Sequence, residues 1–196
     1  VDDDCDGTID SDFDERSASS PPLAAGTWYF HVCAVDNAGN ETPVTHAYTV
    51  VPDVARSDAR IKRGSSGLLV GNNVYNTTGS NQTRTGSAAR GQSVTYYVSV
   101  QNDAAFTEPL RLRGQGSTSQ FTVVYRNPAG LNITNQVTTG AYTTPNLAPQ
   151  ATHQIKVVVT VRTTAPLASS VARTLTATST VDDTIRDTVK FVTRRS

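Results

Sequence analysis

The first sixteen residues carry the densest group of potential metal ligands in the sequence. The stretch VDDDCDGTIDSDFDER places carboxylates at alternate positions, Asp2, Asp4 and Asp6, and follows them with Gly7 and Asp10. Alternate hard oxygen ligands around a glycine turn allow a short loop to surround one Ca²⁺. We therefore expect calcium as a cofactor of this loop, and the alternative is an acidic linker that only carries solvated charge.

The end of this loop departs from the EF-hand pattern. Phe13 stands where an EF-hand carries its bidentate Glu, so Asp12, Asp14 or Glu15 has to supply that carboxylate. The stretch DDDCDGTIDSDFDE resembles a metal-binding motif, with a DxDxDG core, of secreted modular bacterial proteins. That resemblance implies the four alternate aspartates as ligands, together with the backbone carbonyl of Thr8. We expect weak binding, with a Kd on the order of 0.1 to 1 mM.

The cysteines and histidines do not indicate a further metal site. Cys5 and Cys33 form no CxxC pair, and three alternatives stay open for them: a Cys5–Cys33 disulfide, a disulfide to a partner outside this sequence, or free thiols. His31, His46 and His153 have no acidic or cysteine neighbours at ligand spacing. We interpret all three histidines as exposed residues of strands.

Enzyme motifs are missing from the sequence. It contains no nucleophile elbow, P-loop, dinucleotide fingerprint or HExxH. The sixteen Lys and Arg of residues 53–196 outnumber seven Asp and Glu, but they are distributed along the strands without aromatic clusters. We predict a protein that is not an enzyme and has no nucleic-acid partner, with attraction to anionic glycans as the remaining use of this charge. No apolar run has the roughly 20 residues of a membrane span.

The elements that position these residues are predicted to be strands. In TWYFHVCAVDNAGN, the apolar residues Trp28, Phe30 and Val32 alternate with polar ones, and 36–40 has the composition of a turn. A second run follows over residues 44–51. The sequence therefore predicts a β-hairpin that follows the acidic loop.

The stretch PPLAAGTWYFHVCAVDNAGNETPVTHAYTV resembles the last two strands of the fibronectin type III or immunoglobulin-like modules of secreted bacterial proteins. Such modules have about seven strands, so most of this one is missing. The start at Val1 and the lack of Met lead us to expect a fragment of a longer chain. The alternative is that a neighbouring chain completes the module by strand addition.

Residues 53–196 contain six to eight strand patterns. SVTYYVSV and HQIKVVVTV place every second residue on one apolar face and predict central strands, while PLRLRG, FTVVYR, RTLTATST and DTVKFVTRR supply others. Turn compositions fall at 126–130 and 145–150. We interpret 67–91 as a mobile loop with a weak strand near Val74. This pattern predicts a complete immunoglobulin-like β-sandwich.

The patterns GxSVTYYVxVQND and LAPxAxxxIxVxVxV resemble the adhesion-related, CARDB-like domains of bacterial extracellular proteins. The prediction is an all-β chain: an acidic loop (1–16), a partial sandwich module (17–52) and an immunoglobulin-like β-sandwich (53–196). We predict a non-catalytic structural or adhesion module at the cell surface, with other modules, neighbouring copies or surface glycans as partners. The alternatives are a glycan-binding module of a secreted hydrolase and a filament subunit that exchanges strands.

Overall fold

A computed structural model describes residues 26–35, 41–50 and 54–196, the first two ranges without their side chains. The chain divides into two compact units, Val1–Asp53 and Val54–Ser196. The expected calcium ligands and the side chains of the expected disulfide lie outside the described residues: Asp2, Asp4, Asp6, Thr8, Asp10, Asp12, Cys5 and Cys33. The calcium loop and the disulfide therefore stay predictions.

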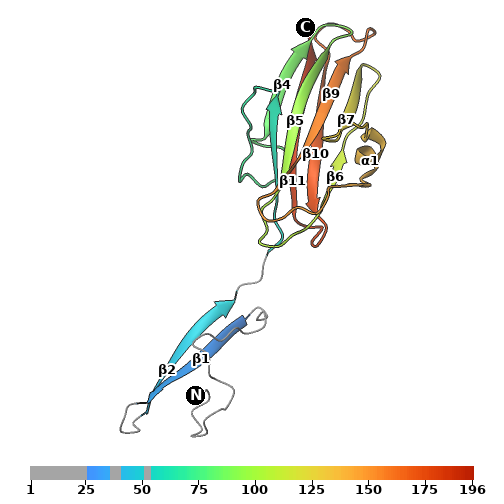
Figure 1. The fold of residues 1–196 in the computed structure, drawn as a ribbon. Helices are drawn as coiled ribbons and strands as arrows, with labels where there is room; N and C mark the ends of the chain where they lie inside the picture. Colours follow the sequence, from blue (N-terminus) through green and yellow to red (C-terminus); the bar gives the residue numbers. More distant parts are fainter. Residues whose placement is uncertain (1–25, 36–40, 51–53) are drawn as a thin grey trace. The chain divides into compact units, whose positions relative to one another are not determined.

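The described part of the first unit is an antiparallel hairpin of β1 (Gly26–Val35) and β2 (Glu41–Val50), drawn in blue and cyan in Figure 1. Its register runs from Gly26 opposite Val50 to Val35 opposite Glu41. The predicted hairpin is confirmed, with a second strand that begins three residues earlier than its apolar pattern indicates. A hairpin alone is marginally stable in water, which keeps both accounts of the missing strands open.

The second unit is a sandwich of two sheets (Figure 1). The four-stranded sheet has the order β3 (Ser57–Arg63), β5 (Ser93–Asn102), β9 (Thr152–Val161) and β7 (Phe121–Arg126). The five-stranded sheet has the order β4 (Thr83–Ala88), β11 (Arg186–Arg195), β10 (Ser170–Ser179), β6 (Leu110–Gly114) and β8 (Tyr142–Thr143). All pairs are antiparallel except β4 with β11. The predicted all-β, immunoglobulin-like sandwich is thus confirmed.

The core lies between the two sheets and follows from the two-residue period of the strands. Every second residue of β5 and β9 faces inward, and side chains from β6, β10 and β11 meet them from the other sheet. Tyr96 and Phe191 pack with their ring centroids 5.4 Å apart, and the Tyr96 hydroxyl donates to the carbonyl of Val192 at 2.6 Å. Each buried Val, Leu or Phe contributes about 1.5–3 kcal/mol through the hydrophobic effect.

The strand expected near Val74 is wrong, and the segment 67–91 instead forms β4 at its C-terminal end. In β4 only Gly86 and Ala88 are buried, so its sequence has almost no apolar alternation. The strand forms because its backbone pairs in parallel with β11. Close contact with the opposite sheet also requires a glycine, since a Cβ at Gly86 would collide with the side chain of Val94.

Helix is minor, as the composition predicts. In the part of the chain that the structure describes, α1 (Thr134–Thr139) is the single α-helix, and no helix is long and apolar enough to cross a membrane. It ends at Gly140, whose φ of 78° is left-handed. Glycine adopts this conformation without strain, so the chain turns there toward β8.

Candidate functional site

The outer face of the five-stranded sheet carries basic and hydroxyl side chains on neighbouring strands. In β6, Leu110 and Leu112 are fully buried, while Arg111 and Arg113 are exposed. Strand β10 likewise buries Leu175 and turns threonines to the other face, because side chains alternate along a strand. The threonines of β10 on this face are Thr174, Thr176 and Thr178.

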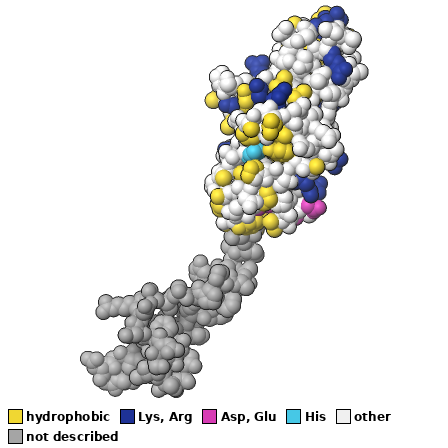
Figure 2. All heavy atoms as spheres, turned by 45° about the vertical axis from the view of Figure 1, so that its right-hand side comes forward, with side chains coloured by type: hydrophobic (Ala, Val, Ile, Leu, Met, Phe, Trp, Pro, Cys, Tyr) yellow, Lys and Arg dark blue, Asp and Glu magenta, His cyan; other side chains and the backbone are white. Residues whose placement is uncertain are grey.

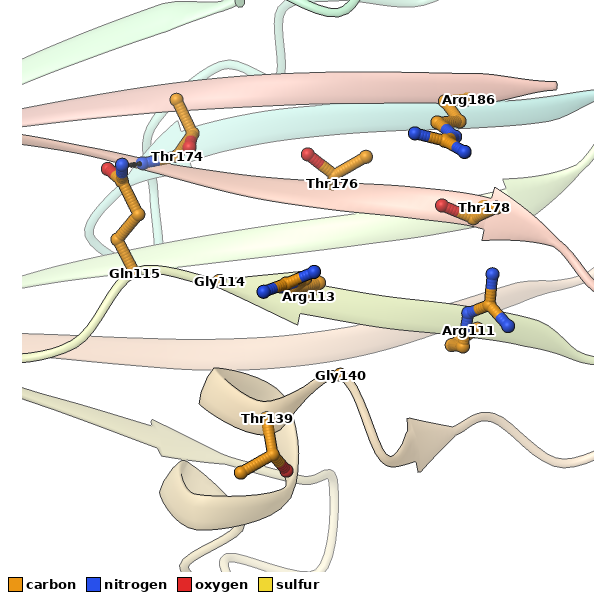
Figure 3. A pocket seen from close by; sticks show the side chains of 10 residues that line it. All are labelled: Arg111, Arg113, Gly114, Gln115, Thr139, Gly140, Thr174, Thr176, Thr178 and Arg186. Atoms are coloured by element: carbon orange, nitrogen blue, oxygen red, sulfur yellow. Dashed lines mark hydrogen bonds between the residues drawn. The ribbon is translucent and has the colours of Figure 1, made fainter. Parts of the chain in front are cut away.

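The register of the strands arranges these side chains in rows. Thr178 lies opposite Arg111 of β6 on one side and opposite Arg186 of β11 on the other. Neighbouring strands are about 4.8 Å apart, so the two arginines flank Thr178 with about 10 Å between their backbones. Figure 3 shows both guanidinium groups extending toward Thr178. In the next row Thr176 lies opposite Arg113.

A shallow hollow of about 490 Å³ lies over these rows. The end of α1 forms one rim, where a Cβ at Gly140 would lie 3.4 Å from Cδ of Arg113, so the glycine gives that arginine room. At the other rim, the Gln115 side chain accepts a hydrogen bond from the Thr174 backbone N–H at 3.2 Å (Figure 3). The lining contains Arg, Thr, Gln and Gly but no aliphatic or aromatic residue. It suits a charged or hydroxylated ligand.

The charge of this face is not compensated within the second unit. The unit has sixteen Lys and Arg against six Asp and Glu, and its one ion pair joins Arg60 to Asp58. None of Arg111, Arg113 and Arg186 therefore has a carboxylate partner there. Three of the six carboxylates are also buried, namely Asp58, Glu108 and Asp187. Figure 2 shows many more basic than acidic side chains on the visible face.

The cluster of Arg111, Arg113 and Arg186 is not evident from the sequence alone. In the sequence the basic residues are distributed along separate strands. The structure brings Arg111 and Arg113 of β6 onto the same face of the sheet as Arg186 of β11, with β10 between the two strands. Sequence separation hides this grouping because β10 pairs with β6, which precedes it by more than fifty residues, and β11 reaches this face only by pairing with β10. The available signal was the alternation LRLRG, which turns two arginines to the same face.

Three of the six carboxylates of the second unit are buried, namely Asp58, Glu108 and Asp187. Asp187 is fully buried and accepts four hydrogen bonds at 2.7–3.0 Å. The donors are the backbone N–H groups of Ala59, Asn76 and Thr188 and the side-chain amide of Gln82. Burial raises the pKa of Asp187, and these hydrogen bonds act in the opposite direction. Asp187 thereby ties β3 and the loop before β4 to β11.

Two further carboxylates are buried in different ways. Glu108 accepts a hydrogen bond from the Ser179 hydroxyl at 2.6 Å. Asp58 is paired with Arg60, whose Nε lies 3.5 Å from Oδ2, and neither oxygen has a hydrogen bond of good geometry within the second unit. Burial, followed by the charge of Asp103, raises the pKa of Asp58 to about 7, although the guanidinium of Arg60 lowers it. Asp58 thus has a charged partner but no well-aligned hydrogen bond within the second unit.

The expected exposure of the histidines is wrong for His153. Its Nε2 lies 2.9 Å from the Tyr142 hydroxyl, its side chain is half-buried, and burial lowers its pKa. The side chains of His31 and His46 lie outside the described residues. Across the residues whose side chains are described, no three His, Cys, Asp or Glu converge as metal ligands.

Comparison with known proteins does not assign the chain to a family. No family model matches the chain, and no curated protein matches it. Among solved structures, it resembles a family 123 glycoside hydrolase of Clostridium perfringens with 8% identity and a TM-score of 0.41, over 58% of this chain and 23% of that one. A FixG-related protein of Vibrio parahaemolyticus gives 9% identity and a TM-score of 0.42, over 73% of this chain and 99% of that one.

A variant of the major pilin subunit of Bacillus cereus is similar at 10% identity and a TM-score of 0.41. This match covers 89% of the present chain and 56% of the pilin chain. The chain thus spans about a quarter of the hydrolase and about half of the pilin. Likeness at this level carries no argument about function, which has to be argued from the site itself.

Proposed function

We propose that the chain is a non-catalytic adhesion module of a bacterial surface or secreted protein, and that the outer face of β6, β10 and β11 binds anionic glycans. One observation carries the proposal: Arg111, Arg113 and Arg186 surround a floor of threonine hydroxyls, and no carboxylate of the second unit pairs with them. Guanidinium groups without a carboxylate partner on a sheet face are available to an external anion, although Nε of Arg186 donates to the carbonyl of Asp183.

The chemistry of the lining favours a charged glycan over a neutral one. Guanidinium groups form paired, charge-assisted hydrogen bonds with carboxylate and sulfate groups. Threonine hydroxyls both donate and accept, as sugar hydroxyls do. Neutral sugars are commonly held by stacking on an aromatic ring, and the hollow has none. The aromatic ring of Tyr97 is on the other sheet, beside Lys62.

The test is the affinity of the full chain for polygalacturonate and heparin, with dextran as the neutral polymer. Reversing two charges in Arg111→Glu with Arg186→Glu should weaken binding to both anionic polymers at least tenfold, because charge-assisted hydrogen bonds contribute about 1.5–3 kcal/mol each. Lys156→Glu with Arg162→Glu is the matched control, since it changes the net charge equally on the other sheet.

Three results would overturn the proposal. Equal losses in both double variants would mean that net charge alone attracts the polymers. Equal affinity of the wild-type chain for dextran would mean that the arginines do not recognise charge. Tighter binding to single-stranded nucleic acid than to either glycan would assign the face to a different polyanion.

A further inference from the structure

A second polar cluster lies on the four-stranded sheet, where β3 pairs with the end of β5. Asp58 lies opposite Gln101, and the N–H of Asp103 donates to the carbonyl of Arg56 at 2.8 Å, which continues the pairing beyond the strand. Because alternate residues share a face, Asp58 and Asp103 are diagonal neighbours on the outer face, about 7–8 Å apart at their backbones. Two carboxylates therefore share one small patch.

The loop between β3 and β4 adds further oxygen atoms to this patch. The Tyr75 hydroxyl lies 2.7 Å from Oδ2 of Asp103 and 3.1 Å from Oδ1 of Asn73. A hydroxyl has one proton and can donate it to one of these two oxygens. The closer carboxylate takes it, so the Asn73 amide oxygen is available to another partner.

Asp58 is the buried carboxylate of this cluster. Its side chain is fully buried, and besides Arg60 the backbone N–H of Asn73 is directed at it, although neither oxygen has a hydrogen bond of good geometry within the second unit. The nearest positive group is Nε of Arg60, 3.5 Å from Oδ2, and this contact is too poorly aligned to be a hydrogen bond. A buried carboxylate is costly unless it is paired or coordinates a metal. Asp58 therefore has one charged partner, Arg60, and no well-aligned hydrogen bond within the second unit.

We propose that Asp58, Asp103 and Asn73 bind one Ca²⁺ through carboxylate and amide oxygens, with water completing the shell. Calcium accepts six to eight oxygen ligands in irregular geometry, whereas Mg²⁺ requires a near-ideal octahedron that one strand, one strand end and one loop do not readily provide. This site is separate from the acidic loop at the start of the chain. The calcium site also does not depend on whether the other sheet binds glycans.

The basic side chains around the cluster set its strength. Arg56 lies over the Tyr75 ring, 4.7 Å from its centroid, and Arg60 contacts Asp58. These two guanidinium groups offset much of the charge of Asp58 and Asp103. We therefore expect a Kd on the order of 0.1 to 1 mM, the range of extracellular calcium modules.

Equilibrium dialysis of the full chain with radioactive calcium tests the site by stoichiometry. Asp103→Asn should bind one calcium ion fewer than the wild-type chain, whatever the acidic loop binds. Asp183→Asn removes an exposed carboxylate of equal charge and should bind as many ions as the wild type. Equal stoichiometry of the wild-type and Asp103→Asn chains would overturn the proposal.

Thermal unfolding gives a second readout. At about 10 mM calcium, a ligand with a Kd near 1 mM should raise the Tm of the sandwich by about 3–6 °C. Asp58→Asn should abolish the calcium-induced rise, because it removes one of the proposed ligands. A calcium-induced rise of equal size in wild type and Asp58→Asn would contradict a role of Asp58 as ligand.

Discussion

Asp187 joins β3, the loop before β4 and β11 through four hydrogen bonds. Three N–H donors, from Asn76, Gln82 and Thr188, converge on its Oδ1, and a fourth from Ala59 reaches Oδ2. A neutral amide in this place brings an NH₂ group against buried donors or leaves them unpaired. Buried unpaired polar groups cost about 1–3 kcal/mol each, and more where a charged partner is lost.

We predict that Asp187→Asn lowers the free energy of unfolding by about 2–4 kcal/mol. Urea unfolding, followed by circular dichroism, measures this change. Asp183→Asn, at an exposed position of the β10–β11 turn, should change the free energy by less than about 0.5 kcal/mol. If the two variants are equally stable, Asp187 does not hold the loop before β4 to the sandwich.

His153 makes stability depend on pH in a defined direction. Burial lowers its pKa below the usual 6.5, so at mildly acid pH the unfolded chain takes up a proton that the folded chain does not. The contribution of His153 to the free energy of unfolding is fully present above pH 6.5, and it is lost as the pH falls toward the pKa of the folded state. The raised pKa of Asp58 has the opposite effect on stability, because the folded chain binds a proton there more readily than the unfolded chain does as the pH falls below about 7.

We therefore predict a difference between wild type and His153→Gln. Between pH 7.5 and 5, the wild-type chain should lose more stability than the variant, since Asp58 is common to both and cancels. Urea unfolding at a series of pH values measures it. A stability difference that does not change with pH would show that His153 titrates alike in both states.

At this scale the sequence indicates residue types but not their environments. Arg111 and Arg113 are predictable as outward neighbours from the alternation in LRLRG. Arg186 could not be assigned to the same face because its partners depend on which strands pair. Asp58 alternates with the core residues of β3, as an exposed residue does, but it is buried, and Asn72 and Asn73 of the loop before β4 lie against this face of β3.

At the scale of elements, β7 shows how the sandwich protects an exposed sheet edge. The N–H groups of Phe121, Val123 and Tyr125 donate to side-chain hydroxyls at 2.9–3.0 Å. The acceptors are the hydroxyls of Thr118, Ser117 and Thr134. Unpaired edge groups are templates for strand addition. The edge of β7 is thus closed to a strand from another chain, which argues against strand exchange at this position.

Opening this edge should promote association. We predict that Ser117→Ala with Thr134→Val frees two backbone donors and increases aggregation on incubation at 37 °C, measured by light scattering. Thr95→Val, on the outward face of β5, is the control because its hydroxyl forms no hydrogen bond within the second unit. A double variant that stays monomeric and as stable as the control would show that the hydroxyls do not protect the edge.

The elements differ in how far their sequences determine them. Strands β5 and β9 are predictable from β-branched and aromatic residues at every second position, and the hairpin of β1 and β2 from its alternation and its turn. Strand β4 is not, because TRTGSA has little apolar periodicity and depends on β11 for its hydrogen bonds. The order of strands in each sheet is a property of tertiary packing that periodicity alone does not contain.

At the scale of the whole molecule, charge is divided unevenly along the chain. The first sixteen residues carry eight Asp and Glu and one Arg, while the remaining chain carries sixteen Lys and Arg against nine Asp and Glu. The sandwich therefore attracts polyanions over distances of about a Debye length, and its association with them should weaken as salt increases. The acidic segment stays a predicted calcium loop, for which the cation offsets the repulsion between neighbouring aspartates.

The most direct measurement is nuclear magnetic resonance mapping of the full chain titrated with oligogalacturonate. Binding should shift the backbone amide signals of β6, β10 and β11 most strongly, centred on Arg111, Thr178 and Arg186, and leave the outward residues of β5 and β9 nearly unchanged. Shifts centred on the four-stranded sheet, or spread evenly over all basic residues, would contradict a specific anion-binding face.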